Sequence, residues 1–164
     1  MSKRRFMVVS GFLGAGKTTT MLALTRYINN HGKRAAIIAN DLGASNIIDA
    51  EYSSRYDVEV TPIAGTCICY VGEVLNECIE RLNKVPKDIV MSDIPGCGIG
   101  ALEHVYGRLD RDYKDDYTLA PFTVVTDPER LRMIMPEQAD INLPEELKFL
   151  LDAQLKEADC VVLK

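Results

Sequence analysis

The sequence predicts an α/β fold of three layers, in which a mainly parallel sheet lies between helices on both of its faces. Three observations support this prediction. Short apolar runs typical of buried strands alternate with longer stretches that carry apolar residues at helical spacing. A glycine-rich loop, residues 11–18 (GFLGAGKT), joins the first such run to the first helical stretch. Two further runs lead into aspartates, at the strand end that faces the ligand in open α/β sheets.

The first half of the chain is predicted to hold strands at residues 5–10 (RFMVVS), 34–39 (RAAIIA) and 57–63 (DVEVTPI), and helices at residues 19–28 and 71–82. The first helix is expected to stop before Gly32, because glycine readily adopts the left-handed conformation found after helix ends. Pro62 is expected to interrupt the third strand. Cys78 is in register with the apolar positions of the second helix, which predicts a core position.

The second half is predicted to hold strands at residues 88–93 (DIVMSD), 122–126 (FTVVT) and 160–163 (CVVL), and helices at residues 101–109, 131–135 and 145–157. The charged run at 110–116 is expected to be a solvated loop. The helix at 145–157 is amphipathic, and its inner side carries Leu147, Leu150, Leu151 and Leu155.

Composition limits the classes of function. The chain has 164 residues, enough for one domain with a single core, of which 47% are hydrophobic and 26% charged. Its formal net charge of -5 argues against a nucleic-acid-binding surface. No stretch approaches the roughly 18 apolar residues of a membrane helix, and the N-terminus lacks the pattern of a secretory signal. We therefore expect a cytoplasmic protein with neither a nucleic-acid nor a membrane partner.

Residues 11–18 match G-x-x-x-x-G-K-[ST], the phosphate-binding loop. Its glycines let backbone N–H groups turn toward phosphates, and the positive end of the following helix adds to the attraction. Lys17 is expected to reach the β- and γ-phosphates, and the Thr18 hydroxyl to bind Mg²⁺. A glycine-rich turn that only caps a helix is the alternative. Residues 1–164 are therefore predicted to form one P-loop nucleotide-binding domain, with phosphate contacts from Gly11, Gly14, Ala15, Gly16, Lys17, Thr18 and Thr19.

Two acids follow predicted strands. Asp41 is placed to bind Mg²⁺ directly or through water, or to orient a nucleophilic water. The alternative is an aspartate that only forms a turn, which would show the same sequence pattern. Asp93 opens a D-x-x-G pattern, in which the acid holds Mg²⁺ through its water shell and the Gly96 N–H touches the γ-phosphate. The predicted catalytic residues are therefore Lys17, Asp41 and Asp93.

The five cysteines are an odd number, which favours thiols or metal ligands over disulfides in the cytoplasm. Cys67 and Cys69, two positions apart, can both face one thiophilic ion such as Zn²⁺. Two thiolates do not complete a tetrahedral site, so further ligands would come from a distant residue, a dimer partner, water or a client protein. Cys97 is a candidate third thiolate. Cysteines packed as small apolar residues under a loop are the alternative.

Together these motifs resemble the nucleotide-binding domain of the CobW/HypB/UreG family of GTPases. The resemblance rests on SGFLGAGKTT at 10–19, NDLG at 40–43, Cys-x-Cys at 67–69, the acid-x-x-Gly at 93–96 and the AD before the last strand, and it covers essentially the whole chain. It implies nucleotide phosphates at residues 14–19, Mg²⁺ near Thr18 with Asp41 and Asp93, and a transition metal at Cys67 and Cys69. It also implies a guanine-nucleotide cycle that delivers nickel, cobalt or zinc, or assists cobalamin cofactors.

The implied partners are GTP, Mg²⁺, a client metalloprotein or corrinoid enzyme, and a second copy of the chain in a nucleotide-dependent homodimer. Departures from the family pattern are the shorter acids Asp41 and Asp93 in place of Glu, and Tyr70 in place of a third cysteine. The family's guanine-reading Asn-Lys-x-Asp would follow the last strand, and the sequence ends at Lys164. We therefore expect either the N-terminal part of a longer protein or a different mode of base recognition, and the preference for guanine rests on the resemblance alone.

Three functions remain open on this basis. The first is a Mg²⁺-dependent GTPase coupled to transition-metal handling, with slow intrinsic turnover because no arginine finger is evident. The second is a P-loop kinase acting on a small molecule, which would need an acceptor pocket and an arginine-rich lid. The third is a nucleotide-binding module without significant turnover.

Overall fold

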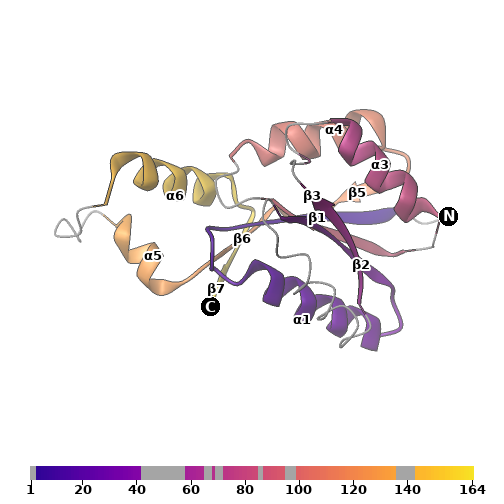
Figure 1. The fold of residues 1–164 in the computed structure, drawn as a ribbon, viewed down its shortest axis with the longest axis horizontal. Helices are drawn as coiled ribbons and strands as arrows, with labels where there is room; N and C mark the ends of the chain where they lie inside the picture. Colours follow the sequence, from indigo (N-terminus) through magenta and orange to yellow (C-terminus); the bar gives the residue numbers. More distant parts are fainter. Residues whose placement is uncertain are drawn as a thin grey trace.

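The structure, a computed structural model, describes residues 3–41, 58–64, 68, 72–84, 87–94, 99–135 and 143–164. Its described strands form one parallel sheet in the order β3-β2-β4-β1-β6-β7, with β5 paired to the first part of β1 (Figure 1). The strands are β1 (Arg4–Ser10), β2 (Ala35–Asp41), β3 (Glu59–Ala64), β4 (Ile89–Asp93), β5 (Tyr117–Leu119), β6 (Thr123–Thr126) and β7 (Cys160–Leu163).

Helices cover both faces of this sheet. They are α1 (Lys17–Asn30), α3 (Gly72–Asn83), the π-helical segment η1 (Leu102–Tyr106) that continues into α4 (Gly107–Asp112), α5 (Pro128–Met133) and α6 (Glu145–Glu157). Figure 1 shows α1 on one face, with α3 and α4 on the other. The predicted three-layer α/β fold is therefore confirmed. No helix among the described residues has the length and apolar character needed to cross a bilayer.

The central strands bury both of their faces, which is why they read as continuous apolar runs. Along β1, Phe6 and Val8 belong to the core under α3 and α4, whereas Val9 belongs to the core that contains Met21 of α1. This alternation follows from the two-residue period of a strand. Cys78 of α3 lies in the first of these cores, as predicted, and burial raises the pKa of its thiol.

The expectation that Pro62 interrupts a strand was wrong. Pro62 lies within β3 and pairs with Ala39 of β2. β3 is at the edge of the described sheet, and an edge strand tolerates proline because one row of its N–H groups has no neighbouring strand to bond.

The predicted loop at 110–116 was also partly wrong. The helix predicted to end at residue 109 continues to Asp112, and the short strand β5 follows at Tyr117. β5 has only three residues, too few to show a two-residue alternation in the sequence. It forms because Tyr117 and its neighbours pair with the first residues of β1.

Tyr106, the last residue of η1, closes a gap beside β1. β5 pairs with β1 as far as Phe6, and β6 begins to pair at Val9, so Val8 lies between the two partners. The Val8 N–H donates to the Tyr106 hydroxyl oxygen at 3.0 Å, and that hydroxyl donates to the Ala120 carbonyl at 2.7 Å. One side chain thus satisfies two backbone groups that the sheet leaves unpaired.

Replacing Tyr106 with phenylalanine is expected to destabilise the protein by about 1–3 kcal/mol, because the buried Val8 N–H loses its acceptor. Burial also raises the pKa of Tyr106 to about 12. An unfolded tyrosine titrates near pH 10, so between about pH 10 and 12 the unfolded state alone loses this proton, and stability falls as the pH rises. Urea unfolding of both proteins between pH 7 and 12 measures the two effects. A Tyr106→Phe protein with unchanged stability at pH 7, or with the same alkaline loss as the parent, would contradict this role.

Candidate functional site

Residues 11–16 form a turn whose backbone favours glycine at three positions. Gly11, Gly14 and Gly16 have φ angles of 138°, 76° and 95°, a region that other L-residues rarely adopt. At Gly11 the chain also passes close to β6, because a Cβ there would lie 2.2 Å from the Val125 carbonyl oxygen. The turn is therefore fixed both by its own backbone and by the strand it passes.

The N-terminus of α1 follows this turn and keeps the features of an anion site. Gly16 precedes the helix without a side-chain cap, and the first turn contains no acidic residue. The Thr20 N–H and hydroxyl both bond the Gly16 carbonyl at 2.9 Å, which stabilises the first turn from within. The N–H groups that open a helix carry partial positive charge, so the residues here fit the phosphates of a nucleotide.

Lys17 lies over the turn. Its Nζ donates to the Gly11 carbonyl at 2.8 Å and reaches the Phe12 carbonyl at 3.5 Å. Thr18 and Thr19 are exposed beside it, whereas Ala15 is buried. A cation and an accessible hydroxyl therefore lie at the mouth of the turn, which is the donor set that a polyphosphate with Mg²⁺ would require.

The acids predicted from the sequence lie at the same edge of the sheet. Asp93 ends β4 and pairs in register with Val9 of β1, two residues before Gly11. Asp93 is buried, with 9% of the residue exposed, and its carboxylate accepts a hydrogen bond from the backbone N–H of Asn40. Asp41 is the last residue of β2, directly after Asn40, and its side chain lies outside the described part of the structure.

Gly100, four residues after the D-x-x-G pattern, is bonded to the end of α6. The Gly100 N–H donates to both carboxylate oxygens of Glu157, at 2.8 and 3.1 Å. Gly96 itself, like Cys67, Cys69 and Cys97, lies outside the described residues. Within the described ranges no three His, Cys, Asp or Glu side chains gather as a metal site would require.

Two basic residues near the turn were not predicted. Lys164 lies against Gly16, where a Cβ would meet its Nζ at 2.7 Å. Arg130 of α5 donates from Nη2 to the Leu13 carbonyl at 2.9 Å. Both are far from the loop in sequence and belong to no phosphate motif that the sequence showed. One indication of their location was present in the sequence: each follows an apolar strand, and the carboxyl ends of these strands lie at the edge of the sheet where the loop also lies.

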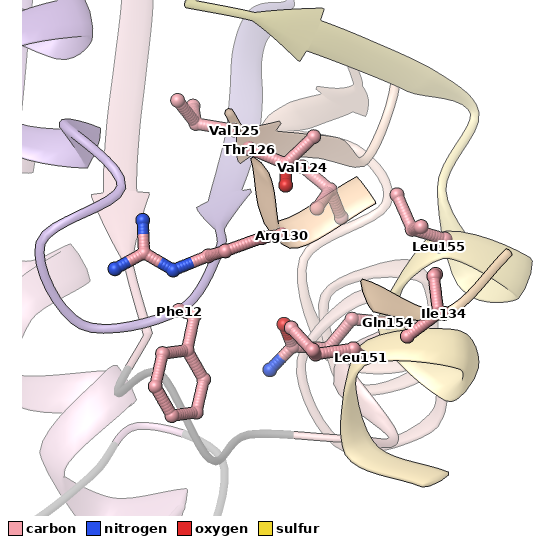
Figure 2. Close-up of a pocket in the computed structure, with 9 residues that line it drawn as sticks. All are labelled: Phe12, Val124, Val125, Thr126, Arg130, Ile134, Leu151, Gln154 and Leu155. Carbon is pink, nitrogen blue, oxygen red and sulfur yellow. The ribbon is translucent and has the colours of Figure 1, made fainter. Parts of the chain in front are cut away.

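A small cavity separates this site from α6. It is lined by Phe12, Val124, Val125, Thr126, Arg130, Ile134, Leu151, Gln154 and Leu155 (Figure 2). Its volume of about 10 Å³ is room for about one water molecule, so it cannot hold a nucleotide or a phosphoryl acceptor. The candidate phosphate site is instead the open mouth of the turn.

Comparison with known families and structures agrees with this geometry. The model of the CobW/HypB/UreG nucleotide-binding domain matches residues 5–164. Among solved structures, the signal recognition particle receptor FtsY from Elizabethkingia anophelis, in complex with GDP, matches with a TM-score of 0.65 at 14% identity, covering 99% of this chain and 49% of its own.

Zn(II)-bound YjiA GTPase from E. coli matches with a TM-score of 0.58 at 18% identity, over 99% of this chain and 49% of its own. The signal recognition particle 54 kDa protein from Aeropyrum pernix K1, in complex with GDP, matches with a TM-score of 0.60 at 15% identity, over 99% of this chain and 42% of its own. This chain thus spans about half the length of the solved structures it matches. At such identities the likeness establishes the fold.

Proposed function

The chain belongs to the CobW/HypB/UreG family, and from that membership we propose that it is a Mg²⁺-dependent GTPase. The observation that carries the proposal is the turn at 11–16, with three glycines at positive φ leading into a helix N-terminus that has no side-chain cap. Such a turn presents N–H groups to an anion. The described residues contain no motif that reads the base. The preference for GTP over other nucleotides therefore rests on family membership.

In the proposed reaction, Lys17 and the N–H groups of residues 14–19 would stabilise negative charge on the transferred phosphoryl group. The Thr18 hydroxyl and Asp93 would hold Mg²⁺, which when bound neutralises charge on the β- and γ-oxygens. Asp41 would position the attacking water, and Gly96 would contact the γ-phosphate. Hydrolysis would then remove the contact that orders the segment after Asp93.

The second part of the proposal is that the nucleotide state controls transition-metal handling. Cys67 and Cys69 are the proposed thiolate ligands for Zn²⁺, Co²⁺ or Ni²⁺, with Cys97 as a third that follows Gly96 directly. The metal is here cargo for a client metalloprotein or corrinoid enzyme. Family membership supports this part, as does the occurrence of a Zn(II)-bound GTPase among similar structures. A nucleotide-dependent homodimer could supply the ligands that two thiolates leave missing.

Metal titration tests this coupling. We expect the affinity for at least one of Zn²⁺, Co²⁺ and Ni²⁺ to differ several-fold between protein with and without a hydrolysis-resistant GTP analogue. The Cys67→Ser/Cys69→Ser protein should lose most of that affinity, because a hydroxyl is a poor ligand for thiophilic ions.

Cys160→Ser is the matched control, since Cys160 is an exposed thiol on β7. Its affinity should equal that of the parent. Metal binding that depends on neither the nucleotide nor Cys67 and Cys69 would remove the metal-handling role and leave nucleotide binding untouched.

A further inference from the structure

Besides Lys17 and Lys164, the side chain of Arg130 touches the glycine-rich loop. The Nη2 of Arg130 donates to the Leu13 carbonyl at 2.9 Å, and its guanidinium carbon lies 5.7 Å from the centroid of the Phe12 ring. A Cβ placed on Gly14 would lie 3.6 Å from the same Nη2. The guanidinium therefore runs along residues 12–14, as the close-up in Figure 2 shows for Arg130 and Phe12.

Arg130 is held from its other end by Asp127. Asp127 precedes α5, accepts the Arg130 backbone N–H at 2.9 Å, and pairs through its second carboxylate oxygen with the guanidinium Nη1. The hydrogen bond from the Arg130 backbone holds the pKa of Asp127 below its usual range, so the carboxylate is charged. Both side chains are less than one-third exposed. The planar guanidinium is thus fixed between a carboxylate and a loop carbonyl.

The bond to Leu13 has a consequence for the next residue. In a trans peptide the C=O and the following N–H point in opposite directions, and the described residues contain no cis peptide. A Leu13 carbonyl directed at α5 therefore turns the Gly14 N–H away from α5. The Ala15 N–H closes the turn around this peptide by bonding the Phe12 carbonyl at 3.0 Å. Gly14 has a φ of 76° and no Cβ to restrict rotation of the peptide, so the bond from Arg130 favours one of its two orientations.

We propose that Arg130 is a positioning residue for the phosphate loop: by bonding the Leu13 carbonyl, it keeps the Gly14 N–H turned toward a bound polyphosphate. The inference rests on the proposed function, since it takes the loop's ligand to be a nucleoside polyphosphate. Asp127 neutralises the guanidinium, so Arg130 acts mainly by orienting the peptide and contributes little net charge to the site. An ordered loop binds more tightly because less of the binding free energy is spent on ordering it.

The test replaces Arg130 with methionine, which keeps an unbranched chain against Phe12 and removes every donor. Binding of a Mg²⁺–GTP analogue should weaken by about tenfold, as expected when the competent orientation falls from dominant to a minor fraction. Arg130→Met leaves the Asp127 carboxylate without its partner, so Asp127→Asn/Arg130→Met, which removes both charges of the pair, is measured as well. This double variant should also bind more weakly than the parent, but with the parent's dependence of affinity on salt, because the net charge of the pair is zero in both. The amide resonance of Gly14 in the ligand-free protein should shift, and Arg130→Lys should restore part of the affinity.

Arg132→Met is the matched control, because Arg132 is an exposed arginine on the same helix. It should bind like the parent. Unchanged affinity in Arg130→Met, with a parent that binds the analogue, would overturn this inference and leave the proposed function standing. If Arg130→Met bound the analogue more weakly but had an unshifted Gly14 amide resonance and a lower melting temperature, Arg130 would only stabilise the fold, and the positioning role would be overturned. A parent that binds no nucleotide would overturn the proposed function, and this inference with it.

Discussion

Lys17→Ala is expected to bind a Mg²⁺–GTP analogue about 100-fold more weakly than the parent protein. The Lys17 ammonium lies over the turn, bonded to the Gly11 carbonyl at 2.8 Å, where it would pair with phosphate oxygens. Loss of a charge-assisted hydrogen bond in a partly buried site costs about 3 kcal/mol, and 1.4 kcal/mol corresponds to tenfold in affinity. The same variant should release phosphate from GTP at no more than the background rate, because the charge on the transferred group is no longer balanced.

Fluorescence titration and a phosphate-release assay measure the two effects. Lys33→Ala is the control, because this substitution removes the same charge from an exposed lysine beyond the C-terminus of α1. If Lys17→Ala bound the analogue as tightly as Lys33→Ala, Lys17 would have no part in phosphate binding.

Gly11→Ala is expected to lower the free energy of unfolding by about 3 kcal/mol or more. Two costs add at this position: a φ of 138°, which a side chain rarely tolerates, and a Cβ only 2.2 Å from the Val125 carbonyl oxygen. The carbonyl belongs to β6 and cannot move without disturbing the sheet. For a domain whose total stability is of the order of 5–15 kcal/mol, such a loss is severe.

Gly32→Ala separates the two costs. Gly32 also has a positive φ, of 75°, but a Cβ there would meet no atom within 4 Å. Its replacement should cost only the backbone term, about 1 kcal/mol. Equal losses in urea unfolding of the two variants would show that the approach of the loop to β6 contributes nothing.

The parts of this fold that the sequence could predict are those set by local pattern. Residues 145–157 form α6 with the bounds expected, because four leucines at helical spacing follow Pro144 and a turn of acids. β7 at 160–163 was equally clear, as an isolated run of apolar residues. The loop at 11–18 was found because its function requires glycine at fixed positions.

What the sequence could not predict depends on contacts between distant residues. β5 exists because β1 offers it a partner, and the π-helical segment before α4 places Tyr106 at the gap beside Val8. The same holds for the site. Arg130 reaches Leu13 across 117 positions of sequence, and nothing local to D-P-E-R distinguishes it from a solvated arginine.

The central claim is that the turn at 11–16 and the first turn of α1 surround a polyphosphate. Backbone amide resonances during titration with Mg²⁺–GTP and with Mg²⁺–tripolyphosphate test it most directly, because the second ligand has no base. We predict that both ligands shift the amides of Gly14, Gly16 and Lys17 at micromolar to low millimolar concentrations, and leave Gly32 at the far end of α1 unchanged. Shifts spread elsewhere, with the amides of 11–19 unmoved by either ligand, would contradict the claim.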